Sequence, residues 1–127
     1  MPTLLMLLLT ACGDHKDSRF ADSNTKPQPA PDSWGKQQFV GNCLQCHALN
    51  KDRTGPMLAG VWGRWNNDTA KVVAFIKNSQ QVIAQDGPKS YSGQLFEKWY
   101  KTTMPAFGGL SDSDIKQILN YANAGVE

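Results

Sequence analysis

The chain has 127 residues, a length that accommodates one ordinary domain. Hydrophobic residues make up 40% of it and charged residues 19%, which excludes a wholly disordered chain. The formal net charge is only +2, whereas a nucleic-acid binder of this size would carry a denser basic patch. The three Cys are an odd number, which argues against a disulfide framework that uses all of them.

Residues 1–11 form an uncharged stretch rich in Leu, which is typical of the apolar core of a signal peptide. The stretch ends in Leu9-Thr10-Ala11-Cys12, which resembles the box of a bacterial lipoprotein signal, although no Lys or Arg precedes Leu4. The resemblance implies cleavage before Cys12 and acylation of that residue. It also implies a lipid anchor on the periplasmic side of a bacterial membrane. The alternative is a buried N-terminal helix in which Cys12 stands by chance.

The segment that follows is rich in charged residues and Pro, and Phe20 is its only large apolar residue. Such a composition cannot bury enough surface to offset the entropy of ordering the chain. We therefore predict that residues 12–31 are the acylated Cys and a disordered tether. The folded domain is expected over residues 32–127.

From position 32 onward, apolar residues recur at helical spacing and no alternating strand pattern competes, which predicts an all-α domain. A short turn at residues 80–84 is expected between the second and third helices. The first expected helix begins at a cap formed by Asp32 or Ser33, and the second covers residues 69–78 with Asn67 or Asp68 as its cap. The third covers about residues 93–101, and the last begins after the cap Ser111.

Cys43-Leu44-Gln45-Cys46-His47 is the Cys-x-x-Cys-His pattern of c-type haem attachment. Two thiols at this spacing can each add across one vinyl group of a haem, and the adjacent imidazole then reaches the iron from one face. A redox dithiol would favour a βαβ context, and a zinc site would need a second ligand pair, and the domain sequence offers neither. The motif therefore predicts one covalent haem c, attached through Cys43 and Cys46.

With this motif, the chain resembles the class I monohaem cytochromes c over about residues 33–126. Gly35 and Phe39 match the Gly-x-x-x-Phe that precedes the haem motif in that family, and Gly55-Pro56 begins a stretch similar to the family's Gly-Pro-x-Leu loop. The resemblance implies the cytochrome c fold, with about four to five helices around one haem and crossing N- and C-terminal helices. It also implies that the Pro56 carbonyl accepts the Nδ1 proton of His47 and leaves Nε2 for the iron.

The second axial ligand must come from the other side of the haem, and Met is the natural candidate because the domain has no second His. Only Met57 and Met104 remain after removal of the predicted signal. Met104 precedes Pro105, which disfavours helical geometry, and the stretch resembles the family's ligand loop before the last helix. We therefore expect His47 and Met104 as the axial ligands of the iron, and Met57 as a residue that lines the pocket or fills core space.

Other polar and aromatic features of the domain are less specific. From Trp34 onward there are ten basic and seven acidic residues, and the Lys residues are scattered, which does not support a strongly cationic docking surface. Several aromatic residues are candidates for a hydrogen bond to a haem propionate or for the pocket wall, and the sequence does not choose among them. They are Trp62, Trp65, Tyr91, Trp99 and Phe107.

Closure of both axial positions suits an electron carrier, because small molecules cannot easily reach the iron. We therefore expect a monomeric, non-enzymatic, membrane-tethered carrier that moves single electrons between respiratory redox complexes. Its partners are expected to be protein redox donors and acceptors, with no nucleic acid. Two alternatives remain open. They are a cytochrome subunit of a larger oxidoreductase, and a peroxidase or gas-binding haem protein in which Met104 is displaced.

Overall fold

The computed structural model describes residues 31–126, with side chains from Trp34 onward. The predicted signal over residues 1–11, Cys12 and the tether up to residue 30 lie outside the described residues. Pro31, which we placed at the end of the tether, is instead the first residue of a helix. Within residues 31–126, no helix combines the length and the apolar character that are needed to cross a bilayer.

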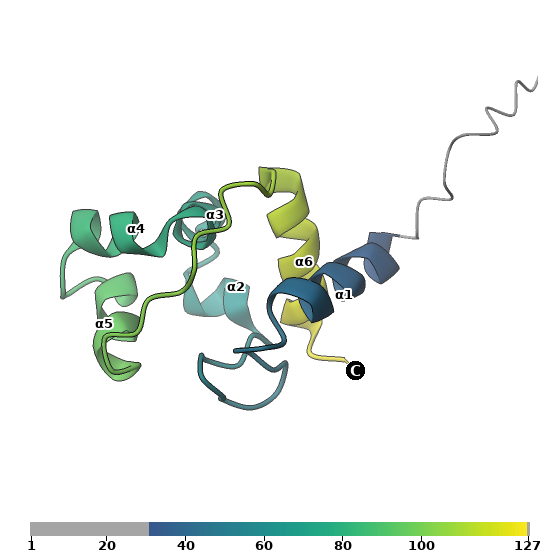
Figure 1. The fold of residues 1–127 in the computed structure, drawn as a ribbon, viewed down its shortest axis with the longest axis horizontal. Coiled ribbons are helices and arrows are strands. Elements are labelled where there is room, and N and C mark those ends of the chain that lie inside the picture. The colour runs from purple at the N-terminus through teal and green to yellow at the C-terminus, as the bar shows by residue number, and fades with distance from the viewer. Residues whose placement is uncertain (1–30, 127) are drawn as a thin grey trace, which may run out of the picture.

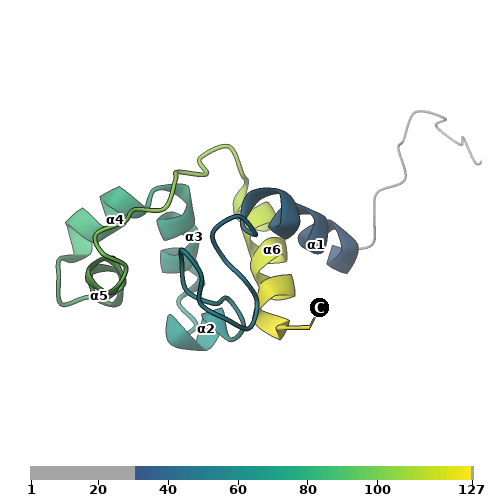
Figure 2. The same ribbon diagram turned by 60° about the horizontal axis from the view of Figure 1, so that its bottom comes forward.

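The described part of the chain is all-α, as the sequence predicted, with six helices and no strand. The helices are α1 (Pro31–Asn42), α2 (Val61–Arg64), α3 (Thr69–Lys77), α4 (Ser79–Asp86), α5 (Tyr91–Lys98) and α6 (Asp112–Ala124). Figures 1 and 2 show α6 crossing α1 at one end of the molecule, α4 and α5 at the other, and α2 and α3 between them. The helix count exceeds the expected four to five.

The first and last helices cross closely because Gly35 has no side chain. A Cβ atom at Gly35 would lie 2.6 Å from the backbone oxygen of Gln117 and 3.3 Å from the Cβ of Tyr121. One turn further along α1, Phe39 is buried, and its ring meets the Tyr121 ring edge to face with 5.6 Å between centroids. Ile118 packs in the same core. The predicted crossing of the terminal helices is therefore confirmed.

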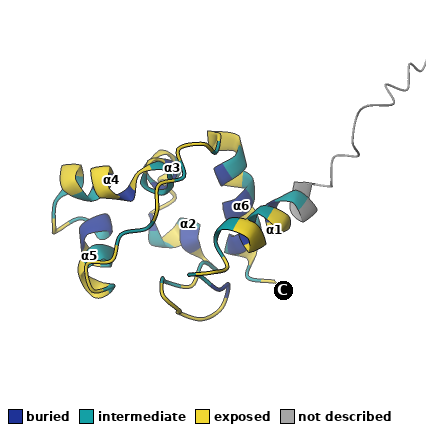
Figure 3. Ribbon diagram, in the orientation of Figure 1, coloured by how far each residue is buried: buried dark blue, intermediate teal, exposed yellow. Residues whose placement is uncertain are grey.

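A second core joins α2, α3 and α6. Trp65, which is 9% exposed, packs against the rings of Phe75 and Tyr91, with 5.0 Å between centroids in each pair. Figure 3 shows that buried residues face the inside of the molecule, while the outer surfaces of the helices are exposed. The other buried members of this core are Val61, Val72, Val73, Ile115 and Leu119.

Local capping explains where two of the helices begin. The Asp68 side chain accepts the N–H of Lys71 at the start of α3, so Asp68 rather than Asn67 is the cap. Ser111 and Asp114 form a reciprocal capping box at the start of α6, which satisfies two N–H groups that have no partner within the helix. The expected cap at Ser111 is confirmed.

Residues 80–84, which we expected to form a short turn, belong instead to the two-turn helix α4. The reason is the Asn78 side chain, which caps this helix by accepting the N–H of Gln81. Gly87 ends the helix, with a φ of 79° that favours glycine.

The bounds of two other helices also differ from expectation. Helix α1 begins at Pro31, before the expected caps Asp32 and Ser33. Helix α5 begins earlier than residue 93, because Ser90 caps it by accepting the N–H of Gly93. It ends before residue 101 because Tyr100 and Lys101 both have positive φ.

Candidate functional site

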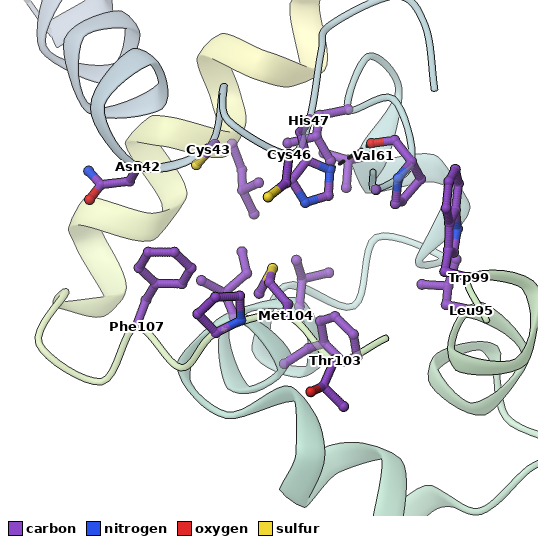
Figure 4. Close-up of a pocket in the computed structure, with 18 of the residues that line it drawn as sticks. Asn42, Cys43, Cys46, His47, Val61, Leu95, Trp99, Thr103, Met104 and Phe107 are labelled. Atoms are coloured by element: carbon purple, nitrogen blue, oxygen red, sulfur yellow. Dashed lines mark hydrogen bonds between the residues drawn. The ribbon is translucent and has the colours of Figure 1, made fainter. Parts of the chain in front are cut away.

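Helix α1 brings the Cys-x-x-Cys-His motif to the wall of a cavity of about 420 Å³. After the helix ends, a tight turn follows in which the backbone N–H of His47 donates to the Cys43 carbonyl at 2.9 Å. Cys43, Cys46 and His47 all line the cavity. Figure 4 shows both sulfur atoms and the imidazole along one wall.

The imidazole of His47 is held in one tautomer. Its Nδ1 lies 2.7 Å from the carbonyl oxygen of Pro56, where the resemblance implied such a contact. A carbonyl can only accept, so Nδ1 carries the proton and Nε2 keeps its lone pair. Burial lowers the pKa of His47, and the hydrogen bond to Pro56 partly opposes this shift. The ring is therefore mainly neutral at pH 7, which is the form that binds iron.

Gly55 provides the space in which the His47 ring lies. A Cβ atom at Gly55 would come within 2.9 Å of both ring nitrogens and closer still to Cε1. The backbone N–H of Gly55 donates to the Cys46 carbonyl at 2.8 Å, which ties this loop to the motif. In the sequence, Gly55 was visible only as part of the family's loop, and nothing local indicated that it packs against the imidazole.

Met104 lies on the wall opposite His47 (Figure 4). It belongs to the irregular segment between α5 and α6. Met57 is 39% exposed and is not among the residues that line the cavity. The expectation that Met57 lines the pocket or fills core space is therefore wrong. Its backbone is nevertheless held at both ends, because its N–H donates to the Asp52 carboxylate and its carbonyl accepts a hydrogen bond from Arg64.

The walls of the cavity are mostly apolar and nearly without formal charge. Among the described residues, Arg64 is the one formally charged residue that lines the cavity, and its guanidinium donates to the backbone carbonyls of Met57 and Ala59. Burial raises the pKa of the Cys43 thiol to about 11. A redox dithiol instead needs a cysteine whose pKa is lowered, so the surroundings of Cys43 do not favour that alternative.

One buried polar atom indicates what the cavity accepts. Among the described side chains, the indole N–H of Trp99 is buried without a hydrogen-bond partner, and Trp99 lines the cavity. A buried donor without an acceptor is costly, and the propionate carboxylates of a haem are acceptors. The sequence could not choose among five aromatic candidates, and this unpaired N–H singles out Trp99. Trp62, by contrast, donates its indole N–H to Asn120.

The residues present fit a haem. Cys43 and Cys46 offer two thiols for attachment, His47 and Met104 offer donor atoms on opposite walls, and Trp99 offers a donor for a propionate.

Known proteins give an independent comparison. A family model described as cytochrome c matches residues 33–123. The chain is 32% identical over 97 residues to a cytochrome c of Gibberella zeae, with 68% of this chain and 87% of that protein covered. It is 32% identical over 88 residues to a cytochrome c6 of Bumilleriopsis filiformis, with 68% and 83% covered. No solved structure gives a significant match. With the family model spanning most of the folded domain, the chain belongs to the cytochrome c family.

Proposed function

We propose that this protein carries single electrons through a haem c that is ligated by His47 and Met104. The family implies a covalently bound haem c and supports haem-based electron transfer. The observation that carries the proposal is the pair of donor side chains on opposite walls of one cavity. His47 is fixed there by its hydrogen bond to Pro56, and Met104 lies across from it (Figure 4).

The residues of the cavity have separate tasks. When haem is bound, its iron is the centre that gains or releases one electron. Cys43 and Cys46 would supply the thiols of the covalent links, while His47 Nε2 and the Met104 thioether would hold the iron. A neutral thioether and apolar walls disfavour the additional positive charge of the oxidised state, which favours a high reduction potential.

The roles of the two methionines can be compared directly. In the haem-loaded protein, Met104→Ala is expected to abolish the ferric iron–sulfur charge-transfer band, because the sulfur ligand is lost. Met57→Ala is the matched control and should leave the band unchanged, since Met57 lies outside the cavity. Absorption spectra of the ferric proteins make the measurement. A band that persists in Met104→Ala, or that is lost in Met57→Ala, contradicts the assignment.

We further propose that the carrier is tethered to the periplasmic side of a bacterial membrane through acylated Cys12 and moves electrons between respiratory redox complexes. The sequence supports this through the apolar residues 1–11 and the Leu-Thr-Ala-Cys box. Each buried acyl CH₂ contributes about 0.8 kcal/mol, and two or more chains give stable anchoring. A tether also raises the local concentration of the carrier near membrane partners, so that weak and rapidly exchanging contacts suffice.

The tether is tested in the full-length chain expressed in a bacterium that matures both lipoproteins and c-type haem. Cys12→Ser is expected to abolish fatty-acid labelling, because the thiol that would be acylated is lost. Ser18→Ala, a control in the same segment, should behave like the wild type. If the Cys12→Ser protein is still labelled with fatty acid to the same extent, Cys12 is not the anchor.

A further inference from the structure

Ser79 is a buried polar residue to which the proposed function assigns no role. Its side chain is 1% exposed, and its hydroxyl donates to the backbone carbonyl of Met104 at 2.9 Å. The bond joins the start of α4 to a segment 25 residues further along the chain. Because a buried hydroxyl is costly when unpaired, this bond ties the two segments firmly together.

The hydroxyl of Ser79 does not cap its own helix. Asn78 is the cap of α4, and its side chain accepts the N–H of Gln81 at 3.1 Å. Ser79 is therefore the first residue inside the helix. Its hydroxyl instead donates to a carbonyl in the segment between α5 and α6.

The Met104 carbonyl is the only hydrogen-bonding group of the peptide unit that joins Met104 to Pro105. Proline has no N–H, so this peptide unit cannot be anchored through a donor. A hydrogen bond that holds this peptide unit must therefore be accepted by the carbonyl, and the Ser79 hydroxyl donates that bond.

The same segment is held on both sides of Met104 by α3 and α4. The N–H of Phe107 donates to the Ile76 carbonyl at 3.1 Å, and the Gln80 side chain donates to the Thr103 hydroxyl at 3.2 Å. The Gln80 contact is exposed, so water can replace it at little cost. The bond from Ser79, which is part-buried, is the one that acts on Met104 itself.

We propose that Ser79 is a positioning residue for the Met104 ligand. By holding the carbonyl, its hydroxyl fixes the plane of the peptide after Met104 and thereby the direction in which the Met104 side chain leaves the backbone. The proposal rests on the role of Met104 proposed above. Without the hydroxyl, Met104 spends a larger fraction of time away from its axial position. A foreign ligand can bind at that position only while Met104 is away from it. The apparent affinity of the foreign ligand therefore rises in proportion to the fraction of time that Met104 is away.

Imidazole binding to the ferric, haem-loaded protein measures this fraction, because imidazole must displace Met104. Ser79→Ala is expected to bind imidazole about five- to tenfold more tightly than the wild type, the size expected when one buried hydrogen bond is lost. Its charge-transfer band should also be weaker. Ser92→Ala is the matched control, because Ser92 is equally buried but its hydroxyl contacts Asp86 and Ser90. Its imidazole affinity should stay within about twofold of the wild type.

Equal imidazole affinities in the wild type and Ser79→Ala would overturn the positioning role. Equal increases in the two Ser variants would also overturn it, since general loosening of the fold would then explain the effect. Met104→Ala separates the two possible failures. If this variant keeps the wild-type band and affinity, the ligand assignment is wrong and the role of Ser79 falls with it. If Met104→Ala loses the band while Ser79→Ala matches the wild type, only the role of Ser79 is wrong.

Discussion

Two adjacent residues of one loop determine how the His47 imidazole lies. The Pro56 carbonyl, 2.7 Å from Nδ1, fixes the tautomer. Gly55 gives the ring its space, because any side chain there would collide with the ring atoms. Residues that contact a metal-binding side chain in this way adjust the orientation and the basicity of that side chain, here the imidazole of His47.

Gly55→Ala is expected to displace the His47 ring and to destabilise the haem-loaded protein by about 1–3 kcal/mol, as overpacking of a close contact does. Gly63→Ala is the control, because a Cβ at Gly63 meets nothing within 4 Å and the residue lies in α2, outside the lining of the cavity. That change should be neutral or stabilising by up to about 1 kcal/mol. Denaturant unfolding measures both variants. Equal stability of Gly55→Ala and the wild type would show that the ring does not depend on this space.

At the scale of helices, a polar cluster joins α3, α4 and α5. Lys71 Nζ of α3 lies 2.7 Å from Asp86 Oδ1 of α4, and the Ser92 hydroxyl of α5 donates to Oδ2 at 3.2 Å. The hydrogen bond from Lys71 is the main cause that lowers the pKa of Asp86, and the Lys71 charge and the Ser92 hydroxyl act in the same direction. The cluster therefore favours the ionised carboxylate in the folded state.

This lowered pKa predicts a pH dependence of stability. The Asp86 carboxylate contributes stability that is fully present above its unfolded-state pKa of about 3.9 and is lost as the pH falls through the lower folded-state pKa. Asp86→Asn removes this contribution, so its thermal midpoint should start lower and fall less steeply below about pH 4 than that of the wild type. Thermal unfolding of the haem-loaded proteins across this range measures the difference.

Asp112→Asn serves as the control for that experiment. Asp112 also pairs with a lysine, Lys77, but its side chain is 63% exposed, so water screens the pair. Its pH profile should lie closer to that of the wild type, and acid effects that all the proteins share cancel in the comparison. Parallel profiles for the wild type and Asp86→Asn would contradict a role for the cluster.

At the scale of the whole molecule, formal charge is scarce around the cavity. Val40 and Leu44, which flank Cys43 in the chain, are 50% and 38% exposed, and residues 102–110 on the opposite wall include no charged residue. Figure 4 shows Cys43 and Phe107 on these two walls. One positive charge stands beside the first of these walls, because the Arg53 guanidinium donates to the Leu44 carbonyl. Small, transient contacts with redox partners fit such a surface.

The features that could be predicted from the sequence depend on fixed spacing or on neighbouring residues. The crossing at Gly35, the cap at Ser111 and the arrangement of the haem motif are of this kind. Helix α4 was missed because its stability depends on the Asn78 cap more than on an apolar pattern. The positions of Trp99 and Ser79 depend on contacts with distant segments, which no local pattern indicates.

The central claim is that protein groups close both axial positions of the haem iron. Addition of CO to the ferrous, haem-loaded wild-type protein at neutral pH tests it most directly. We expect a low-spin ferrous spectrum that CO leaves unchanged, because the proposed ligands His47 and Met104 would occupy the two positions. A high-spin spectrum, or a prompt change on addition of CO, would show an open position at the iron and would contradict the account.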